Sequence, residues 1–372
     1  MRNPDLANVP VMRPQLPTAE ELRPYIERID AARYYSNHGP LLRELESAFA
    51  AHFDVTPDRV ALVNNGTVAL SAALVAAGAR AESKCLMPSW TFVGSAAAAW
   101  AANLVPHFVD VDPETWMLDL DRLKRRPDLA EVGAVMIVSA FGSPVDTAAC
   151  DRFTDETGIP VIIDCAASFD TVATVPIAAP GRSPIMISLH ATKVLGTGEG
   201  GLVLSTDETL IRRLNQVCNF GVWDSPAGQI LGYNGKLSEY NAAVGLAFLK
   251  TWPERRARLA ALTDRYAKLL RTKAGIDLLP SFGSGWVSCY CNIAPKLRDF
   301  NQNIQALSNL GIETRRWWQN GVHVQPAYRG FPRDPLPTTE RLAKRVFGLP
   351  FFHDLTDADF ERVANGIDAL VG

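Results

Sequence analysis

The sequence predicts an α/β fold, in which helices sandwich a mostly parallel sheet, followed by a smaller C-terminal α+β domain. Between residue 58 and about residue 205, short apolar β-rich runs alternate with Ala-rich helical segments. Strands that are apolar throughout are typical of parallel sheets covered on both faces. After Leu237 the pattern changes to a long, charged helical stretch. We therefore expect a large domain over residues 1–250, with an N-terminal segment, and a small domain over residues 251–372.

The elements of the large domain follow one another in regular order. The expected strands are "RVALVNN", "KCLMPSW", "VPHFVDVD", "VGAVMIVSAF" and "IPVIIDCAA". The helices expected between them are "TVALSAALVAAGA", "FVGSAAAAWAAN" and "DTAACDRFTDETG". Ligands bind such sheets at the carboxyl ends of the strands, so the residues that follow each run are the candidates for a site.

The second half of the chain is less regular. The charged helical stretch is expected to break near Pro253, because proline removes a helical hydrogen bond. "WVSCYCNIA" is strand-like, "DFNQNIQALSNLG" is helix-like, and an amphipathic helix is expected from about Asp357. Together these segments predict the smaller domain.

Composition restricts the class of partner. Lys plus Arg total 37 against 40 for Asp plus Glu, a net charge of -3, so no bulk attraction to nucleic acid or to anionic membrane is expected. The six cysteines include no C-x-x-C pair, which predicts reduced thiols, a cytoplasmic location and no metal site. No stretch is apolar enough for a membrane span or a signal peptide. A small-molecule partner is the expectation that remains.

The segment "SLHATKVLGTGEGGLVLS" contains an apparent dinucleotide fingerprint at Gly196, Gly198 and Gly201. A true fingerprint follows a strand and opens a helix, whereas these glycines lead into another apolar β-rich run. We interpret them instead as a tight turn beside a bulky ligand, small enough to admit cofactor and substrate. Lys193, among small and apolar neighbours, is either a solvated surface lysine or a desolvated amine whose pKa is depressed and which acts as a nucleophile.

A lysine that forms a Schiff base with pyridoxal phosphate (PLP) needs an anion near the ring nitrogen, a stacking aromatic ring and a phosphate site. Asp164 can supply the anion, although it could also cap a turn. Trp90 can stack on the ring, and packing in the core is the alternative. Gly66 and Thr67 begin a helix whose N–H groups can bind the phosphate, or Thr67 is an ordinary cap.

Taken together and in this order, these segments resemble the DegT/DnrJ/EryC1/StrS sugar aminotransferases, which are fold-type-I PLP enzymes related to aspartate aminotransferase. The resemblance covers almost the whole chain. The segments that carry it are "SNHGPLLRELE", "NGTVAL", "PSWTF", "HFVDVDPETWMLD", "VIIDCAA", "SLHATKVLGTGEGGLVLS", "GYNGKLSEYNAAVGLA" and "LPFF".

The resemblance implies a role for each matching position. Lys193 would form the Schiff base with PLP, Asp164 would contact the pyridine nitrogen and Trp90 would stack on the ring. The phosphate would be held by Gly66, Thr67 and Ser188 and, because these enzymes build each site at a homodimer interface, by Asn234 of the neighbouring subunit. One position departs from the family: Ala167 stands where Gln or His usually contacts the cofactor's phenolic oxygen, so that a water or Ser168 would have to serve.

The residues of "NHGP", "IDCAASFD" and the lysine segment most resemble those of the subgroup that aminates nucleotide-linked 4-keto-6-deoxy sugars. Ping-pong transfer from glutamate through Lys193 is the implied reaction. His323 and Arg316 lie where relatives approach the substrate, and a packed His323 is the alternative. Amination at C3, a non-catalytic PLP-binding regulator and a nicotinamide oxidoreductase are the competing hypotheses. A sugar dehydratase is disfavoured, since such relatives have histidine in place of the lysine.

Overall fold

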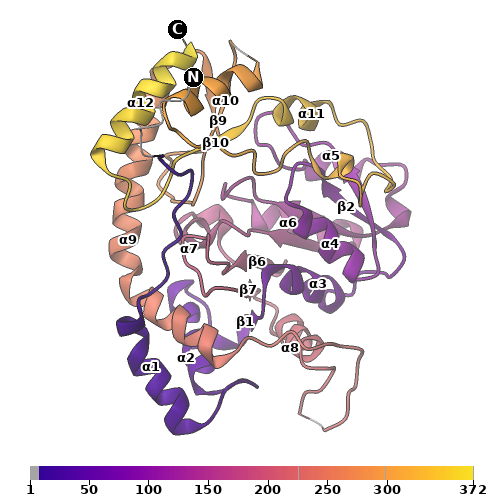
Figure 1. Ribbon diagram of the computed structural model, residues 1–372. Helices are drawn as coiled ribbons and strands as arrows, with labels where there is room; N and C mark the ends of the chain where they lie inside the picture. The colour runs from indigo at the N-terminus through magenta and orange to yellow at the C-terminus, as the bar shows by residue number, and fades with distance from the viewer. Residues whose placement is uncertain (1–7, 225, 298, 372) are drawn as a thin grey trace.

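The computed structural model describes residues 8–371 except 225 and 298, and it confirms the predicted α/β class (Figure 1). The large sheet has seven strands in the order β1-β7-β6-β5-β4-β2-β3. Strand β7 is antiparallel to both of its neighbours, and the remaining neighbours pair in parallel. The strands are β1 (Val60–Val63), β2 (Lys84–Pro88), β3 (Val105–Val109), β4 (Val132–Val138), β5 (Val161–Asp164), β6 (Ile185–Ser188) and β7 (Gly201–Leu204).

Both faces of this sheet are buried, which explains why its strands are apolar throughout. Leu62 belongs to one hydrophobic cluster, whereas Ala61 and Val63 on either side of it belong to a second cluster. The same alternation separates Ile163 from Ile162 in β5. Since successive side chains of a strand point to opposite faces, a strand covered on both sides has no polar face.

Helices connect the strands, and several begin at a side chain that caps them. Asn65, Asp146 and Asp207 each accept a hydrogen bond from the backbone N–H three residues later, which satisfies a donor that the helix itself leaves free. The helices of the large domain are α1 (Ala19–Ala32), α2 (Pro40–His52), α3 (Gly66–Ala76), α4 (Val93–Ala101), α5 (Leu120–Lys124), α6 (Thr147–Thr157), α7 (Phe169–Thr174) and α8 (Glu208–Val217).

The long helix α9 (Glu239–Arg271) joins the two domains. The predicted break at Pro253 is wrong, because the 33-residue helix continues through the proline, and Figure 1 shows it as one long, bent helix. Packing outweighs the lost hydrogen bond here: the first half of α9 contacts α1 and α2, and Trp252 beside the proline is buried. The boundary expected after residue 250 therefore falls inside this helix.

The small domain contains a three-stranded antiparallel sheet in the order β10-β9-β8. Its strands are β8 (Ile276–Leu278), β9 (Cys291–Pro295) and β10 (Phe347–Leu349), and its helices are α10 (Phe300–Asn309), α11 (Pro337–Ala343) and α12 (Asp357–Val371). The predicted strand-like and helix-like segments correspond to β9, α10 and α12. No helix in the described part of the chain has the length and apolarity needed to cross a membrane.

The N-terminal segment differs from the prediction that placed it in the large domain. The N–H of Val9 donates to the carbonyl of Gly311 at 2.8 Å, and the N–H of Phe351 donates to the carbonyl of Val11 at 3.1 Å. The segment is therefore attached to the small domain before it runs down to α1 (Figure 1). The segment thus connects the small domain to α1 and lies beside α9 (Figure 1).

Candidate active site

The carboxyl ends of β1 and β6 bring two predicted phosphate-binding groups together. Gly66 and Thr67 are the first residues of α3, and Ser188 is the last residue of β6. A Cβ built on Gly66 would lie 3.5 Å from the Cβ of Ser188. The first N–H groups of a helix have no partner within it, so they and the Ser188 hydroxyl can converge on one anion.

Asp164 lies at the end of β5 and is 6% exposed. Its carboxylate accepts hydrogen bonds from Ser95 Oγ at 2.7 Å and from the N–H of Ala166 at 3.1 Å. Both of these partners are neutral groups. Burial raises the pKa of Asp164, and the two hydrogen bonds and the charge of Lys193 oppose this shift only in part. A buried carboxyl in this state would be stabilised by contact with a cation.

Lys193 lies in the connection between β6 and β7. Its backbone N–H donates to the carbonyl of His190 at 2.9 Å, and its Nζ donates to Tyr290 Oη at 3.1 Å. Burial favours the neutral amine, but Tyr290, Cys289 and Asp164 together outweigh it, so that the pKa of Lys193 is raised above its ordinary value. The prediction of a depressed pKa is therefore wrong, because apolar neighbours along the sequence do not exclude polar neighbours in space.

The glycines of this connection pack against the protein's own backbone. A Cβ on Gly201 would lie 2.6 Å from the carbonyl oxygen of Asn65, and one on Gly196 would lie 2.9 Å from that of His190. Strand β7 begins at Gly201, and this strand context excludes a dinucleotide fingerprint. At both positions the missing side chain permits this close backbone contact, and the role of the glycines in admitting a ligand stays a prediction.

Trp90 is packed in the core, which was the alternative to a stacking role. It is 2% exposed, and its ring makes edge contacts with Trp116, Phe141 and Trp318. The indole is therefore enclosed by other side chains in this structure.

The aromatic side chain that is exposed in this segment is Phe92, at 63%. A Cβ on Gly94 would lie 3.2 Å from the Phe92 ring and 3.3 Å from Thr67 Oγ1, so Phe92 borders the start of α3. Sequence reasoning missed Phe92 because the larger Trp90 is the more conspicuous aromatic residue in "PSWTF".

The two residues predicted to approach the substrate are held by the protein instead. His323 is 3% exposed, with its Nδ1 2.6 Å from Ser89 Oγ. The guanidinium of Arg316 donates to the carbonyl of Ala343 at 2.5 Å and packs over the ring of Phe300. A packed histidine was the alternative for His323, and a substrate contact by either side chain stays a prediction.

Ser168 does not replace the polar side chain missing at Ala167. Ser168 is 1% exposed and its Oγ lies 2.8 Å from Ser139 Oγ, while Ser139 in turn donates to the carbonyl of Ser143 at 2.6 Å. The hydroxyl is thus engaged in a buried hydrogen-bond chain. Ala167 is itself 8% exposed.

Asn234 lies apart from the other predicted site residues, in the connection between α8 and α9. It is exposed and forms an isolated bridge with Asn219. The position is compatible with a contact to a second subunit, and that role stays a prediction.

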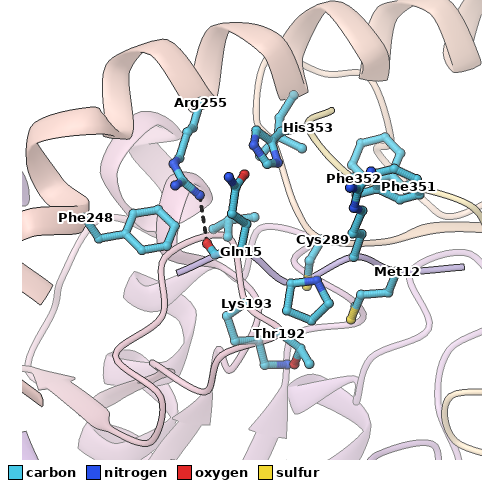
Figure 2. Close-up of a pocket in the computed structure, with 14 residues that line it drawn as sticks. Met12, Gln15, Thr192, Lys193, Phe248, Arg255, Cys289, Phe351, Phe352 and His353 are labelled. Atoms are coloured by element: carbon cyan, nitrogen blue, oxygen red, sulfur yellow. Dashed lines mark hydrogen bonds between the residues drawn. The ribbon is translucent and has the colours of Figure 1, made fainter. Parts of the chain in front are cut away.

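A small cavity of about 50 Å³ lies beside Lys193, between the N-terminal segment and α9 (Figure 2). Arg255 of α9 crosses it and donates to the carbonyl of Gln15 at 2.9 Å. This volume can hold a few water molecules and is too small for a cofactor. Within the described ranges, no cluster of His, Cys, Asp or Glu is arranged to hold a metal ion.

The structure thus places the predicted lysine, carboxyl and phosphate-binding groups at the carboxyl edge of the large sheet of an α/β protein. The family model described as the DegT/DnrJ/EryC1/StrS aminotransferase family matches residues 17–368. The chain belongs to this family.

Relatives of known name agree with this assignment. The chain is 27% identical over 367 residues to the dTDP-4-amino-4,6-dideoxy-D-glucose transaminase of Escherichia coli, covering 94% of this chain and 95% of the relative. A crystal structure from Bacillus cereus ATCC 10987, described as a PLP-dependent aminotransferase, superposes with a TM-score of 0.89 at 27% identity, covering 97% of this chain and 100% of that one. The structure of DesI with its TDP-sugar product gives 0.85 at 29% identity, covering 99% and 93%.

Proposed function

We propose that the protein is a PLP-dependent aminotransferase that moves an amino group from glutamate to a nucleotide-linked keto sugar. The observation that carries the proposal is the placement of a half-buried amine, Lys193, close enough to act electrostatically on a buried carboxyl, Asp164, whose hydrogen-bond partners are all neutral. Membership of the aminotransferase family supports it.

The groups at the strand ends fit the cofactor in charge and in chemistry. The start of α3 and the Ser188 hydroxyl suit its phosphate, Asp164 suits a protonated ring nitrogen, and Lys193 supplies the amine. The glycine at position 94 leaves open the space between Phe92 and Thr67, so that the exposed Phe92 ring can cover a flat ligand.

When bound, PLP supplies a conjugated ring that withdraws electrons from the carbon bearing the transferred amine. In the proposed mechanism Asp164 holds a proton at the ring nitrogen, which keeps the ring electron-poor. The Lys193 Nζ would be the group that binds the cofactor covalently, and as a free amine it could accept and donate the transferred proton as general base and acid. The same side chains serve both halves of a ping-pong reaction, first with glutamate and then with the keto sugar.

The substrate class rests on the relatives. The names of the Escherichia coli transaminase and of the DesI complex both specify a thymidine-linked sugar. We therefore propose a dTDP-4-keto-6-deoxyhexose as the amino acceptor. This proposal would be contradicted by amination at C3 or by binding of PLP without turnover.

We further propose a cytoplasmic homodimer in which Asn234 contacts the phosphate bound by the neighbouring subunit. Exposed aromatic side chains support a protein interface: Tyr34, Tyr35 and Tyr240 are 42–49% exposed, and the rings of Tyr35 and Tyr240 stack at 6.4 Å. All six cysteines are free and buried, which supports a reducing compartment.

The proposal is tested by incubating the reconstituted protein with glutamate and a panel of nucleotide-linked keto sugars. We expect glutamate to bleach the visible absorption, and a dTDP-4-keto-6-deoxy sugar to restore it and to yield a 4-amino product by mass and NMR. Lys193→Ala is the matched control and should yield none. Bleaching with amination at C3 would reassign the sugar, and colour without bleaching would contradict catalysis.

A further inference from the structure

Tyr290, which precedes β9 in the small domain, contacts the reactive amine of the large domain directly. Its Oη accepts a hydrogen bond from Lys193 Nζ at 3.1 Å, and Nζ lies 5.3 Å from the centre of its ring. Neither the composition nor the spacing of "VSCYCN" indicates this contact, because it joins residues 97 positions apart.

The segment that carries Tyr290 is fixed by hydrogen bonds to the large domain. The N–H of Val287 donates to Asp170 Oδ2 at 2.9 Å, and Ser288 Oγ donates to the carbonyl of Phe141 at 2.7 Å. The phenol ring is then held by edge contacts with Phe141 and Trp317, at 5.4 and 4.8 Å between ring centres. Tyr290 is therefore preorganised, with its hydroxyl directed at the amine.

The hydroxyl groups near Ala167 form hydrogen bonds with other groups of the protein. Ser168 is bound to Ser139, and Ser288 donates to a backbone carbonyl. Ala167 has no side-chain polar atom. In the described part of the chain, Tyr290 is the side chain that forms a hydrogen bond with Lys193 Nζ.

Several charged and titratable groups surround this pair. Cys289 and Asp164 act on Lys193 electrostatically, and the cavity beside Lys193 is lined by the cations Arg13 and Arg255 and by His353, whose pKa is lowered by burial. Burial raises the pKa of Tyr290 to about 12, although the charge of Lys193 opposes this. The phenol is thus neutral at physiological pH, and its oxygen is a permanent acceptor for the N–H of Lys193.

We propose that Tyr290 is a catalytic residue of this site, whose hydroxyl binds the Lys193 nitrogen and stabilises its protonated form. In this way Tyr290 takes over the role of the polar side chain that is missing at Ala167. The stabilisation of protonated Lys193 contributes to catalysis only if the proposed PLP function is correct. The hydrogen bond itself belongs to the ligand-free protein and can be tested separately.

The test compares wild type with Tyr290→Phe, which keeps the ring contacts and removes only the hydroxyl. Tyr266→Phe is the control: it removes a buried hydroxyl of α9 that donates to the carbonyl of Pro350 at 2.6 Å. In the ligand-free proteins, the rate at which a small acylating reagent modifies Lys193 is followed against pH by peptide mass spectrometry. In the PLP-loaded proteins, the visible absorption is titrated against pH.

We expect Tyr290→Phe to lower the pKa of the Lys193 nitrogen by about one unit in both titrations, so that ligand-free Lys193 reacts about tenfold faster at a fixed pH below both midpoints. Tyr266→Phe should leave both midpoints in place. Equal midpoints in wild type and Tyr290→Phe would overturn the inference, even if transamination is intact. A shift in the ligand-free titration, with no colour in any PLP-treated protein, would instead reject the proposed function and with it the catalytic role.

Discussion

Two buried carboxylates six residues apart have opposite surroundings. Asp170, at the start of α7, has a 2.6 Å ion pair with Arg256 Nε, a second bond to the same guanidinium and a hydrogen bond from the N–H of Val287. Asp164 has hydrogen bonds from one hydroxyl and one N–H only. The carboxylate of Asp170 has an ion pair within the chain, whereas that of Asp164 has neutral hydrogen-bond partners and would be stabilised by direct contact with a cation.

The same contrast extends to the regions around them. Near α7 and α9, polar groups such as Asp170 and Arg256 find their partners inside the protein. At the carboxyl ends of β1, β2, β5 and β6, the start of α3 and the ring of Phe92 remain open to a ligand. We conclude that substitutions in the closed region change stability, and that substitutions in the open region change ligand binding and activity.

The largest effect is expected for Asp164→Asn, which keeps the shape of the side chain and removes its charge. We expect kcat/KM to fall by a factor of about 10²–10³, because the group that stabilises the protonated ring is lost. Steady-state kinetics with saturating PLP measures this. A loss below about threefold would remove Asp164 from the proposed mechanism.

The same variant predicts a pH dependence of stability. Since the pKa of Asp164 is raised in the folded ligand-free protein, the folded state retains this proton at pH values where the unfolded state has lost it. Wild-type stability should therefore fall as pH rises through this interval, relative to Asp164→Asn. Thermal unfolding of both ligand-free proteins between pH 4 and pH 8 compares them, and parallel curves would contradict the raised pKa.

In the closed region, Asp170→Asn should lower the free energy of unfolding by about 2–3 kcal/mol. Removing one partner of a buried ion pair leaves the other charge uncompensated, and the one-third exposure of Arg256 moderates the effect. Urea unfolding of the ligand-free protein measures the loss. The PLP affinity of the folded fraction should be unchanged, and a stable variant with weakened PLP binding would break the comparison between the two carboxylates.

A smaller loss is expected for Gly201→Ala, since its new Cβ would lie 2.6 Å from the Asn65 carbonyl oxygen. Overpacking of this kind destabilises by about 1–3 kcal/mol. Gly330→Ala is the control, because no atom lies within 4 Å of its added Cβ. Chemical denaturation of both variants should separate them. If the two behave alike, the glycine does not serve the backbone contact that we describe.

The smallest effect on ligand binding is expected at the stacking ring, and Trp90 provides the comparison in stability. Phe92→Ala should weaken PLP binding about tenfold, the contribution of roughly one aromatic contact, with little change in stability because the side chain is exposed. Trp90→Ala should instead destabilise the protein by about 3–5 kcal/mol, since it empties a core position. Equilibrium PLP titration and unfolding of each variant test the pair. Normal PLP affinity in Phe92→Ala would show that Phe92 does not stack on the cofactor.

Sequence reasoning placed Asp164, Ser188 and Gly66 at the ends of strands, because the alternation of strands and helices can be recognised from neighbouring residues. An apolar run ending in Asp164 or Ser188 shows both the strand and the edge at which it ends. The same reasoning could not place Tyr290, since its contact with Lys193 depends on how the small domain packs against the large one. It also chose Trp90 and did not consider Phe92, because the sequence does not show which aromatic residue is enclosed by other side chains.

The continuity of α9 through Pro253 has a similar cause. A local rule predicts a break there, and the contacts of α9 with α1 and α2, together with the buried Trp252, override that rule. The hydrogen bonds of His323 and Arg316 likewise depend on partners distant in sequence, Ser89 and Ala343. Chemistry at strand ends was predictable, whereas contacts between domains were not.

The most direct test of the central claim is to reduce the PLP-treated protein with borohydride and to locate the added mass by peptide mapping. We predict that the cofactor becomes fixed on the peptide containing Lys193, and that Lys193→Ala incorporates none at equal PLP concentration. Attachment at another lysine, or equal labelling of wild type and Lys193→Ala, would contradict the account.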